Sequence, residues 1–452
     1  MNFARIFDDS RFLCKGMIIV IAAGIILRVV LGYSFGYNND VNAWAMTISS
    51  INGGAGLYDM AGYYYPPVWG YMLGFFGEII EHLGIDSLGS HFTELIFMRN
   101  IEEEPLTPSP TFNLAISMFI LIADLLSSFA IYWIIDHFTQ DKVKAKIGFV
   151  LYFLGANVLV LSMMLEMFDS FVALMMLLCF ILLIKGQDFL AGVMFCLAVM
   201  TKAFPGFLLF ILIAYLIKKD REHCVKRIIL AALGTIVALV ILTLPEIISG
   251  NFLDIFSFFF ARVDGSSQTS TIDKITSYGT LPVYICILLL EIALAVYFVK
   301  RETEDVDRSF LFFMLIASAL IFINPGAPQY TLLMVPFLII GFVMFDNRMK
   351  YALVTLIIGS IVAHMMHFSA DMIAVTMFDG WIPFDVWKEI HEINVGPNLI
   401  TYRALEWIGM VIQLLAVVLA EYYALDRLGI IDKIKKHIQS RKDGTKEESS
   451  DS

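Results

Sequence analysis

The sequence predicts an all-α polytopic membrane protein, and three observations lead to this fold class. Of the 452 residues, 59% are hydrophobic and only 16% are charged, whereas about a quarter of a typical globular protein is charged. The mean hydropathy is +0.77, and a soluble fold of this length has no means of burying that much apolar surface. Apolar runs close to the roughly 20 residues that cross a bilayer recur along the whole chain.

Twelve apolar segments are expected to cross the membrane. The first follows Arg5, Arg11 and Lys15 and has no small-residue cleavage site after it, so we expect a retained helix rather than a removed signal peptide. Residues 188–201 and 204–217 are short, and one long broken helix is the alternative to two spans there. The expected spans are residues 16–34, 112–135, 147–163, 169–185, 188–201, 204–217, 227–248, 280–299, 308–323, 330–345, 351–368 and 399–424.

The basic residues favour two separate spans at this point. Lys and Arg concentrate in cytoplasmic loops of membrane proteins, and with twelve spans 24 of the 31 basic residues fall on one face, six on the other and Arg28 inside the first span. If residues 188–217 formed a single span, the basic clusters at Lys300 and Arg348 would fall on the outer face. We therefore expect about twelve spans and both termini in the cytoplasm, in the plasma membrane if the source is a prokaryote.

The domain organisation follows from this topology. Residues 1–425 are predicted to form one transmembrane domain, and the charged residues 426–452 a basic, disordered cytoplasmic tail. The first outer loop, residues 35–111, is long enough to hold interfacial helices such as 67–83, and it includes an acidic, Pro-rich piece. Loops of this length are usually functional or disordered.

Composition also excludes several classes of function. The net charge of −11 and the lack of a basic stripe with interleaved aromatic residues argue against nucleic acid as a partner. The five cysteines are scattered and never occur as C-x-x-C, so neither a disulfide framework nor a zinc site is predicted. Membrane lipids remain as expected partners.

An acid lies directly after the first span. Asp40 belongs to the segment YNNDVNAW, where a simple connector would need no carboxylate. One interpretation is an acid of a turn or of a helix end. The other is a general base that takes a proton from an acceptor hydroxyl.

Lys202 lies in the segment MTKAFPG, between two short apolar helices, with Pro205 at the start of the second. Its long side chain is able to reach a lipid head group from a helix end. The alternative is a broken helix pair that presents charge to an anionic ligand. A lysine suits a phosphate because its charge is compact.

Two more acids and one arginine are expected at the same outer face. Glu166 and Asp169 are three residues apart in LEMFD, a spacing that puts both on one side of a helical turn; Asp169 has the alternative role of helix N-cap. A metal site shared with Asp40 is the alternative, but no D-x-D or histidine spacing supports it, and none is predicted. Arg262 is suited either to bidentate contact with phosphate or to the membrane interface.

The motifs together resemble a known group, the GT-C glycosyltransferases that use polyprenyl-phosphate sugars. The closest layouts are those of the glycosyltransferase family 87 mannosyltransferases and of the eukaryotic first mannosyltransferase of the GPI pathway. The matching positions are Asp40, Gly54 to Tyr58, Tyr63 to Pro67, Lys202 with Pro205, and Asn324 to Pro336.

The resemblance implies a GT-C fold with Asp40 as the catalytic base and Lys202 at the donor phosphate. Family 87 members often carry His where this chain has Gln329, so only a binding role is carried over to that residue. The predicted substrate-binding set is Lys202, Arg262, Asp169, Glu166, Gln329 and Tyr65.

The implied reaction is inverting transfer of a hexose, with mannose first, from a polyprenyl-phosphate sugar to a hydroxyl of a glycolipid, a surface glycan or a protein. It takes place at the outer side of the membrane. No cofactor and no metal are expected, because cationic side chains stabilise the leaving lipid phosphate.

Two other functions fit an apolar chain with few charges. A multispanning transporter or flippase for a polar or lipid-linked sugar would place its ionisable groups near the bilayer midplane, often within inverted repeats; here they gather at one end of the spans. An O-antigen-type polymerase or ligase would need several arginines in the large outer loop, which has only Arg99.

Overall fold

The structure is a computed structural model that describes residues 11–36, 38–59, 63, 65–85, 109–256, 271–323, 328–367 and 399–436. Within these ranges the chain is helical and contains no strand. The long helices are α1 Lys15–Ser34, α4 Pro110–Thr139, α10 Cys224–Ser249, α12 Thr271–Lys300, α15 Met349–His367 and α18 Leu399–Arg427. The shorter α-helices are α2 Asn38–Asn52, α3 Pro67–His82, α5 Lys142–Phe153, α6 Ala156–Leu159, α7 Asp169–Ile184, α8 Asp188–Val199, α9 Leu209–Lys219, α13 Val306–Leu320 and α14 Met334–Met344.

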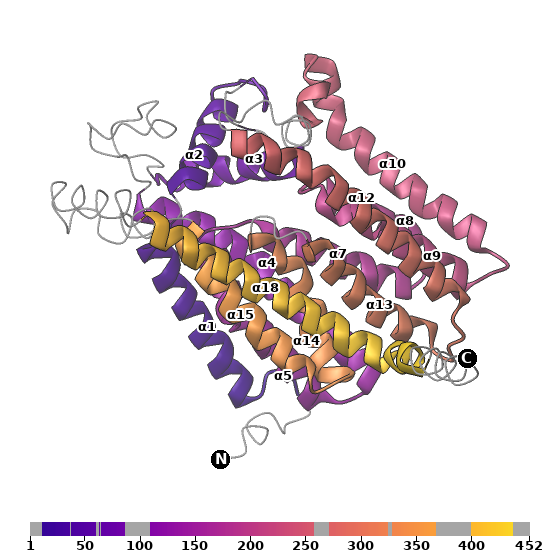
Figure 1. The fold of residues 1–452 in the computed structure, drawn as a ribbon. Coiled ribbons are helices and arrows are strands. Elements are labelled where there is room, and N and C mark those ends of the chain that lie inside the picture. The colour runs from indigo at the N-terminus through magenta and orange to yellow at the C-terminus, as the bar shows by residue number, and fades with distance from the viewer. Residues whose placement is uncertain are drawn as a thin grey trace, which may run out of the picture.

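Most helices run side by side in one bundle (Figure 1). Six are long and apolar enough to cross a membrane, and four shorter apolar helices lie among them in the described part of the chain. Helices α1 and α10 expose Ile, Leu and Val over much of their length, as lipid-facing helices do. The all-helical polytopic class is confirmed, whereas the number of about twelve spans stays a prediction.

The segment 188–217 forms two helices, as predicted. Arg227, early in α10, pairs with Asp188 at the start of α8 at 2.7 Å, and the hydroxyl of Tyr215 in α9 lies 3.4 Å from the carbonyl of Leu183 near the end of α7. The start of α8 and the latter part of α9 are therefore at the same end of the bundle. The chain reverses between them, at Lys202.

Glycines let α8 and α10 approach each other closely. A Cβ on Gly192 would lie 1.9 Å from the carbonyl oxygen of Ala231, and one on Gly234 would lie 1.9 Å from that of Phe189. Small residues allow such backbone contact between membrane helices, where dispersion rather than the hydrophobic effect drives association.

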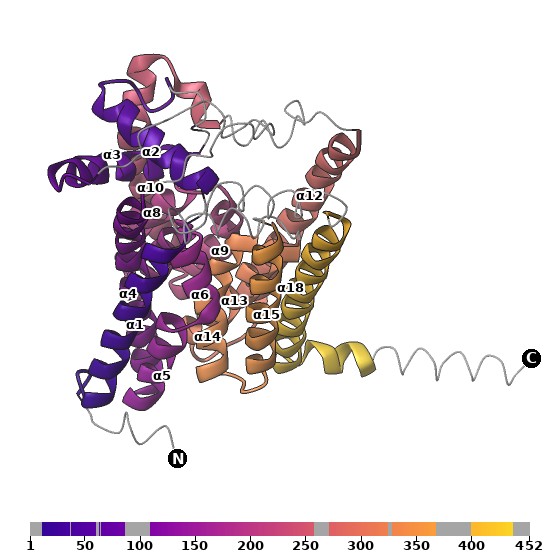
Figure 2. The ribbon, with the colours of Figure 1, turned by 90° about the vertical axis from the view of Figure 1, so that its left-hand side faces the viewer.

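Helices α2 and α3 lie at one end of the bundle (Figure 2). Helix α3 corresponds to the predicted interfacial helix 67–83, and the indoles of Trp44 and Trp69 join it to α2 with ring centroids 5.3 Å apart. Between them Gly54 has φ +85°, a conformation that favours glycine. The acidic segment 102–108 lies outside the described residues.

The start of α1 and the end of α18 are both at the opposite end of the bundle, on different sides of it (Figure 2). Beyond Arg427 the chain is described only as far as residue 436. The assignment of residues 426–452 to a cytoplasmic tail therefore stays a prediction.

Candidate active site

Asp40 lies in the first turn of α2, shortly after α1 ends at Ser34. A carboxylate is favourable in this position because the helix N-terminus carries partial positive charge. The side chain is half-buried and makes no hydrogen bond to another described residue. Its oxygens are thus free to accept a proton.

Three influences set the pKa of Asp40. Burial is the largest and raises the pKa from its ordinary 3.8, Lys202 lowers it, and Asp169 raises it, with a result of about 6. Both charges act on Asp40 although they lie more than 100 residues away in the sequence. The structure therefore brings Asp40, Lys202 and Asp169 into one electrostatic cluster, as a general base near neutral pH requires.

Lys202 occupies the reversal between α8 and the 3-10 helix η4, Phe204–Leu208. Its backbone N–H donates to the carbonyl of Ala198 at 3.0 Å, and the preceding Met200 carbonyl accepts from the N–H of Val68 at 3.2 Å. The second bond ties the reversal to the start of α3. The lysine is held from both sides and is almost fully buried.

The ammonium of Lys202 is paired with Asp169. Its Nζ lies 2.6 Å from Asp169 Oδ2, and both side chains are shielded from solvent. Breaking a buried pair leaves an uncompensated charge, which costs far more than an exposed pair contributes. Asp169 thus fixes the direction of the Lys202 ammonium group. Asp169 is the first residue of α7, and Phe168 is the N-cap, so the predicted capping alternative is wrong.

Aromatic rings surround the ammonium group. The Nζ of Lys202 lies 4.5 Å from the ring centroid of Phe168, 4.8 Å from that of Tyr330 and 5.7 Å from that of Tyr65. Trp69 stacks on Phe168 with centroids 4.6 Å apart. Cations are attracted to ring faces at these distances. The rings exclude water and leave the cation in an environment where charge interactions are strong.

The Tyr65 segment is braced by hydrogen bonds within the same loop. The hydroxyl of Tyr58 donates to the carbonyl of Tyr65 at 2.8 Å, and the hydroxyl of Tyr63 accepts from the N–H of Gly70 at 2.6 Å. The segments Gly54 to Tyr58 and Tyr63 to Pro67 thus form a scaffold, which sets Tyr65 beside Lys202.

Gln329 and Glu166 lie at different places around this cluster. Gln329 precedes Tyr330, is buried, and its Oε1 has no partner among the described residues. Glu166 is fully buried with φ +53°, and it accepts from the hydroxyl of Ser117 in α4 at 3.1 Å. The Glu166 carboxylate is therefore oriented toward α4 and makes no hydrogen bond or ion pair with Lys202.

Two residues that the sequence did not single out hold the start of α7. Asp124 in α4 pairs with Arg28 of α1 at 3.2 Å, and both are fully buried. The hydroxyls of Ser162 and Ser170 lie 2.6 Å and 2.7 Å from the carboxylate oxygens of Asp124. Ser170 directly follows Asp169, so this network anchors the turn that carries the partner of Lys202.

Other predicted features are not described. Arg262 lies outside the described residues. Residues 324–327 of the Asn324 to Pro336 motif also lie outside them. Among the residues that are described, no group of three His, Cys, Asp or Glu side chains could hold a metal ion.

The cluster combines a carboxylate with free oxygens and a shielded ammonium group. The first is suited to remove a proton and the second to stabilise negative charge on a leaving group. Such a pair serves group transfer to a hydroxyl.

A family model agrees with this chemistry. The model of glycosyltransferase family 87 matches residues 105–325. That range contains Glu166, Asp169 and Lys202, whereas Asp40 and Gln329 lie outside it. A search of curated proteins found no match.

Proposed function

Because the model of glycosyltransferase family 87 matches residues 105–325, we propose that the chain is a member of this family and that it transfers a hexose from a polyprenyl-phosphate sugar to an acceptor hydroxyl with inversion. Mannose is the first choice of hexose. The acceptor is a glycolipid, a surface glycan or a protein. The observation that carries the proposal is the electrostatic cluster of Asp40 with the buried Lys202–Asp169 pair.

In the proposed reaction, Asp40 takes the proton of the acceptor hydroxyl. The oxygen attacks the anomeric carbon while the bond from that carbon to the phosphate oxygen breaks. The bonding electrons leave with the phosphate, which becomes a polyprenyl phosphate, and the configuration at the anomeric carbon inverts. Each proton and electron pair is accounted for without a further reactant.

Lys202 is assigned to the leaving phosphate. An ammonium group has three N–H donors, and Asp169 engages one of them at 2.6 Å. The remaining donors are available to phosphate oxygens, and their effect grows as charge develops on the leaving group. Tyr65, Gln329, Glu166 and Arg262 complete the proposed substrate-binding set.

We further propose that the site faces the outer side of the membrane. The reversal at Lys202 lies at the end of the bundle away from the start of α1 and the end of α18, where most basic residues fall, and basic ends face the cytoplasm. On this proposal residues 1–425 form the transmembrane domain and residues 426–452 its cytoplasmic tail.

The test supplies purified protein in lipid vesicles with polyprenyl-phosphate mannose or polyprenyl-phosphate glucose, with membrane extract as acceptor. Release of polyprenyl phosphate together with sugar transfer is expected. Asp40→Asn should lower transfer by about 10²–10⁴-fold, the usual range for a general base. Asp59→Asn is the matched control, because Asp59 lies in the same loop but bonds to Asn251 instead of the cluster. Transfer at the wild-type rate by Asp40→Asn would remove Asp40 as the base.

A further inference from the structure

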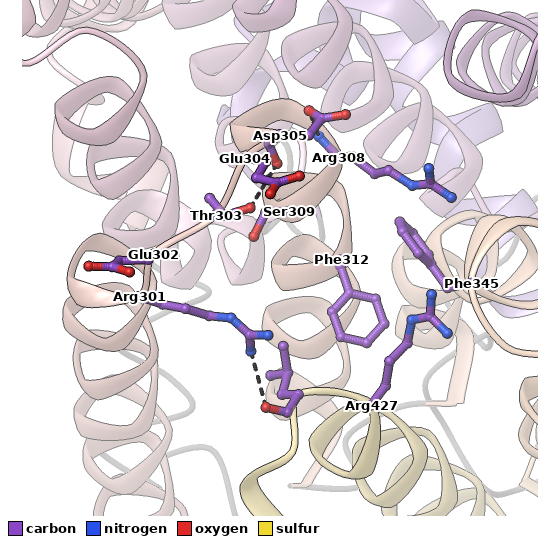
Figure 3. Close-up of a pocket in the computed structure, with 11 residues that line it drawn as sticks. Arg301, Glu302, Thr303, Glu304, Asp305, Arg308, Ser309, Phe312, Phe345 and Arg427 are labelled. Carbon is purple, nitrogen blue, oxygen red and sulfur yellow. Dashed lines mark hydrogen bonds between the residues drawn. The ribbon is translucent and has the colours of Figure 1, made fainter.

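A hollow of about 640 Å³ opens at the end of the bundle opposite Lys202. It lies where α12 ends, α13 begins, α14 ends and α18 ends (Figure 3). Its lining residues are Arg301, Glu302, Thr303, Glu304, Asp305, Arg308, Ser309, Phe312, Phe345, Arg427 and Leu428. Three arginines and three acids therefore line one cavity outside the candidate active site.

Two of these arginines flank the same aromatic ring. The guanidinium carbons of Arg308 and Arg427 lie 5.6 Å and 5.8 Å from the ring centroid of Phe345, and both side chains reach toward that ring (Figure 3). Phe312 is buried beside them. Stacking on a ring holds a guanidinium in place and leaves its N–H groups at the edge for a ligand.

Neither guanidinium has a carboxylate partner among the described residues, although acids are numerous nearby. Arg348 binds both Asp346 and Asp426, at 2.7 Å and 2.9 Å. These two carboxylates are thus occupied. The N–H groups of Arg308 and Arg427 are therefore not taken up by ion pairs with described carboxylates, although Arg427 acts electrostatically on Asp346.

Three acids also line the hollow, namely Glu302, Glu304 and Asp305. Lys219 pairs with Asp307 at 2.7 Å, and Asp305 caps α13 by accepting from the N–H of Arg308 at 2.9 Å. Glu302 points away from the two arginines (Figure 3). Arg301 donates to the carbonyl of Leu428 at 3.4 Å and so joins the ends of α12 and α18.

We propose that this hollow binds a phosphate group, presented by the head group of an anionic membrane lipid. Paired guanidinium groups match the oxygens of phosphate in charge and in planar geometry. The candidate spans α12 and α18 end at Lys300 and Arg427, so the hollow is at the depth where lipid head groups lie. A free phosphate ion offers the same chemistry without the membrane, and the experiment separates the two sources.

The lipid arm measures binding of phosphatidylglycerol and phosphatidylcholine to the full-length protein by native mass spectrometry. The wild type should prefer phosphatidylglycerol, and the double variant Arg308→Gln/Arg427→Gln should lose about tenfold in affinity for it, as loss of charge-assisted bonds predicts. Arg308→Lys/Arg427→Lys keeps the charge and should retain part of the preference. An unchanged preference in the Gln variant would overturn the proposal.

The control and the soluble arm complete the test. Arg221→Gln/Lys226→Gln removes two exposed charges near the same end of the bundle but outside the hollow, and its lipid preference should equal that of the wild type.

Inorganic phosphate at about 10 mM is tested for a rise in melting temperature, as a ligand of the folded state produces. A rise that the Gln variant abolishes, with no lipid preference, would assign the site to soluble phosphate and overturn the lipid source. A lipid preference lost equally in the control would reduce the effect to general surface charge and overturn the site.

Discussion

Transfer activity should fall about tenfold when the pH is lowered from 7 to 5, because Asp40 must be ionised to act as a base. Its pKa is raised to about 6, so about nine-tenths of the molecules are ionised at pH 7 and about one-tenth at pH 5. The sign follows from the raised pKa: activity is present above 6 and is lost as the pH falls through it. The donor is a phosphate diester, whose charge is constant over this range.

Two substitutions should move this profile in opposite directions. Lys202→Met removes the cation that lowers the pKa of Asp40, so the midpoint should rise, on the order of one unit, equivalent to roughly 1.4 kcal/mol. Asp169→Asn removes a carboxylate that raises the pKa, so the midpoint should fall. Both variants should also transfer more slowly, since each disrupts the pair at the leaving phosphate.

The assay follows transfer of radiolabelled mannose from polyprenyl-phosphate mannose at a donor concentration well below saturation, in buffers of constant ionic strength. Under this condition the rate reports kcat/KM and therefore the free enzyme. Asp59→Asn should keep the wild-type profile. A wild-type rate that is flat between pH 5 and 7, or a shift of both variants in the same direction, would refute the assignment of Asp40.

Three further outcomes test the surroundings of the site. Arg28→Met should lower the free energy of unfolding by about 3–5 kcal/mol, because Asp124 is left as an uncompensated buried charge; thermal melting in detergent measures this loss, and Arg28→Met/Asp124→Leu should recover part of it. Gly192→Leu should lower the melting temperature, since its side chain meets the backbone of α10, whereas Gly206→Ala should not, because no atom lies within 4 Å of its Cβ position. A chelator should leave transfer unchanged if cationic side chains stabilise the phosphate; lost activity that a divalent metal restores would contradict this expectation.

The sequence was informative where the signal is local. Apolar runs predicted the helical membrane class, the basic residues predicted that 188–217 forms two helices, and α8 and α9 confirm this division. The same count put Asp40 and Lys202 on one face, and the electrostatic effect of Lys202 on Asp40 agrees. These inferences depend only on hydropathy and charge read along the chain.

Contacts between residues far apart in the chain could not be predicted from hydropathy and charge alone. Arg28 and Asp124 are 96 residues apart, and each is a single charge in an apolar run with nothing nearby to indicate its partner. Phe168 and Tyr330 enclose Lys202, yet in so aromatic a sequence they resemble ordinary packing residues. Glu166 was grouped with Asp169 by spacing, but its φ of +53° turns it toward Ser117. The three-residue spacing predicted that Glu166 and Asp169 share one side of a regular helical turn, and the left-handed backbone conformation of Glu166 is not that of a regular helix.

The start of α7 connects the membrane interior to the site. Ser170 reaches Asp124 on one side and Asp169 reaches Lys202 on the other, so two consecutive residues join two buried ion pairs. Buried charges are costly unless their partners hold fixed positions, and the Arg28–Asp124 pair fixes α7 relative to α1 and α4. The position of the Lys202 ammonium, and through it the pKa of Asp40, therefore depends on packing deep within the bundle. This dependence gives the charged residues deep in the bundle a role in positioning the candidate active site at its end.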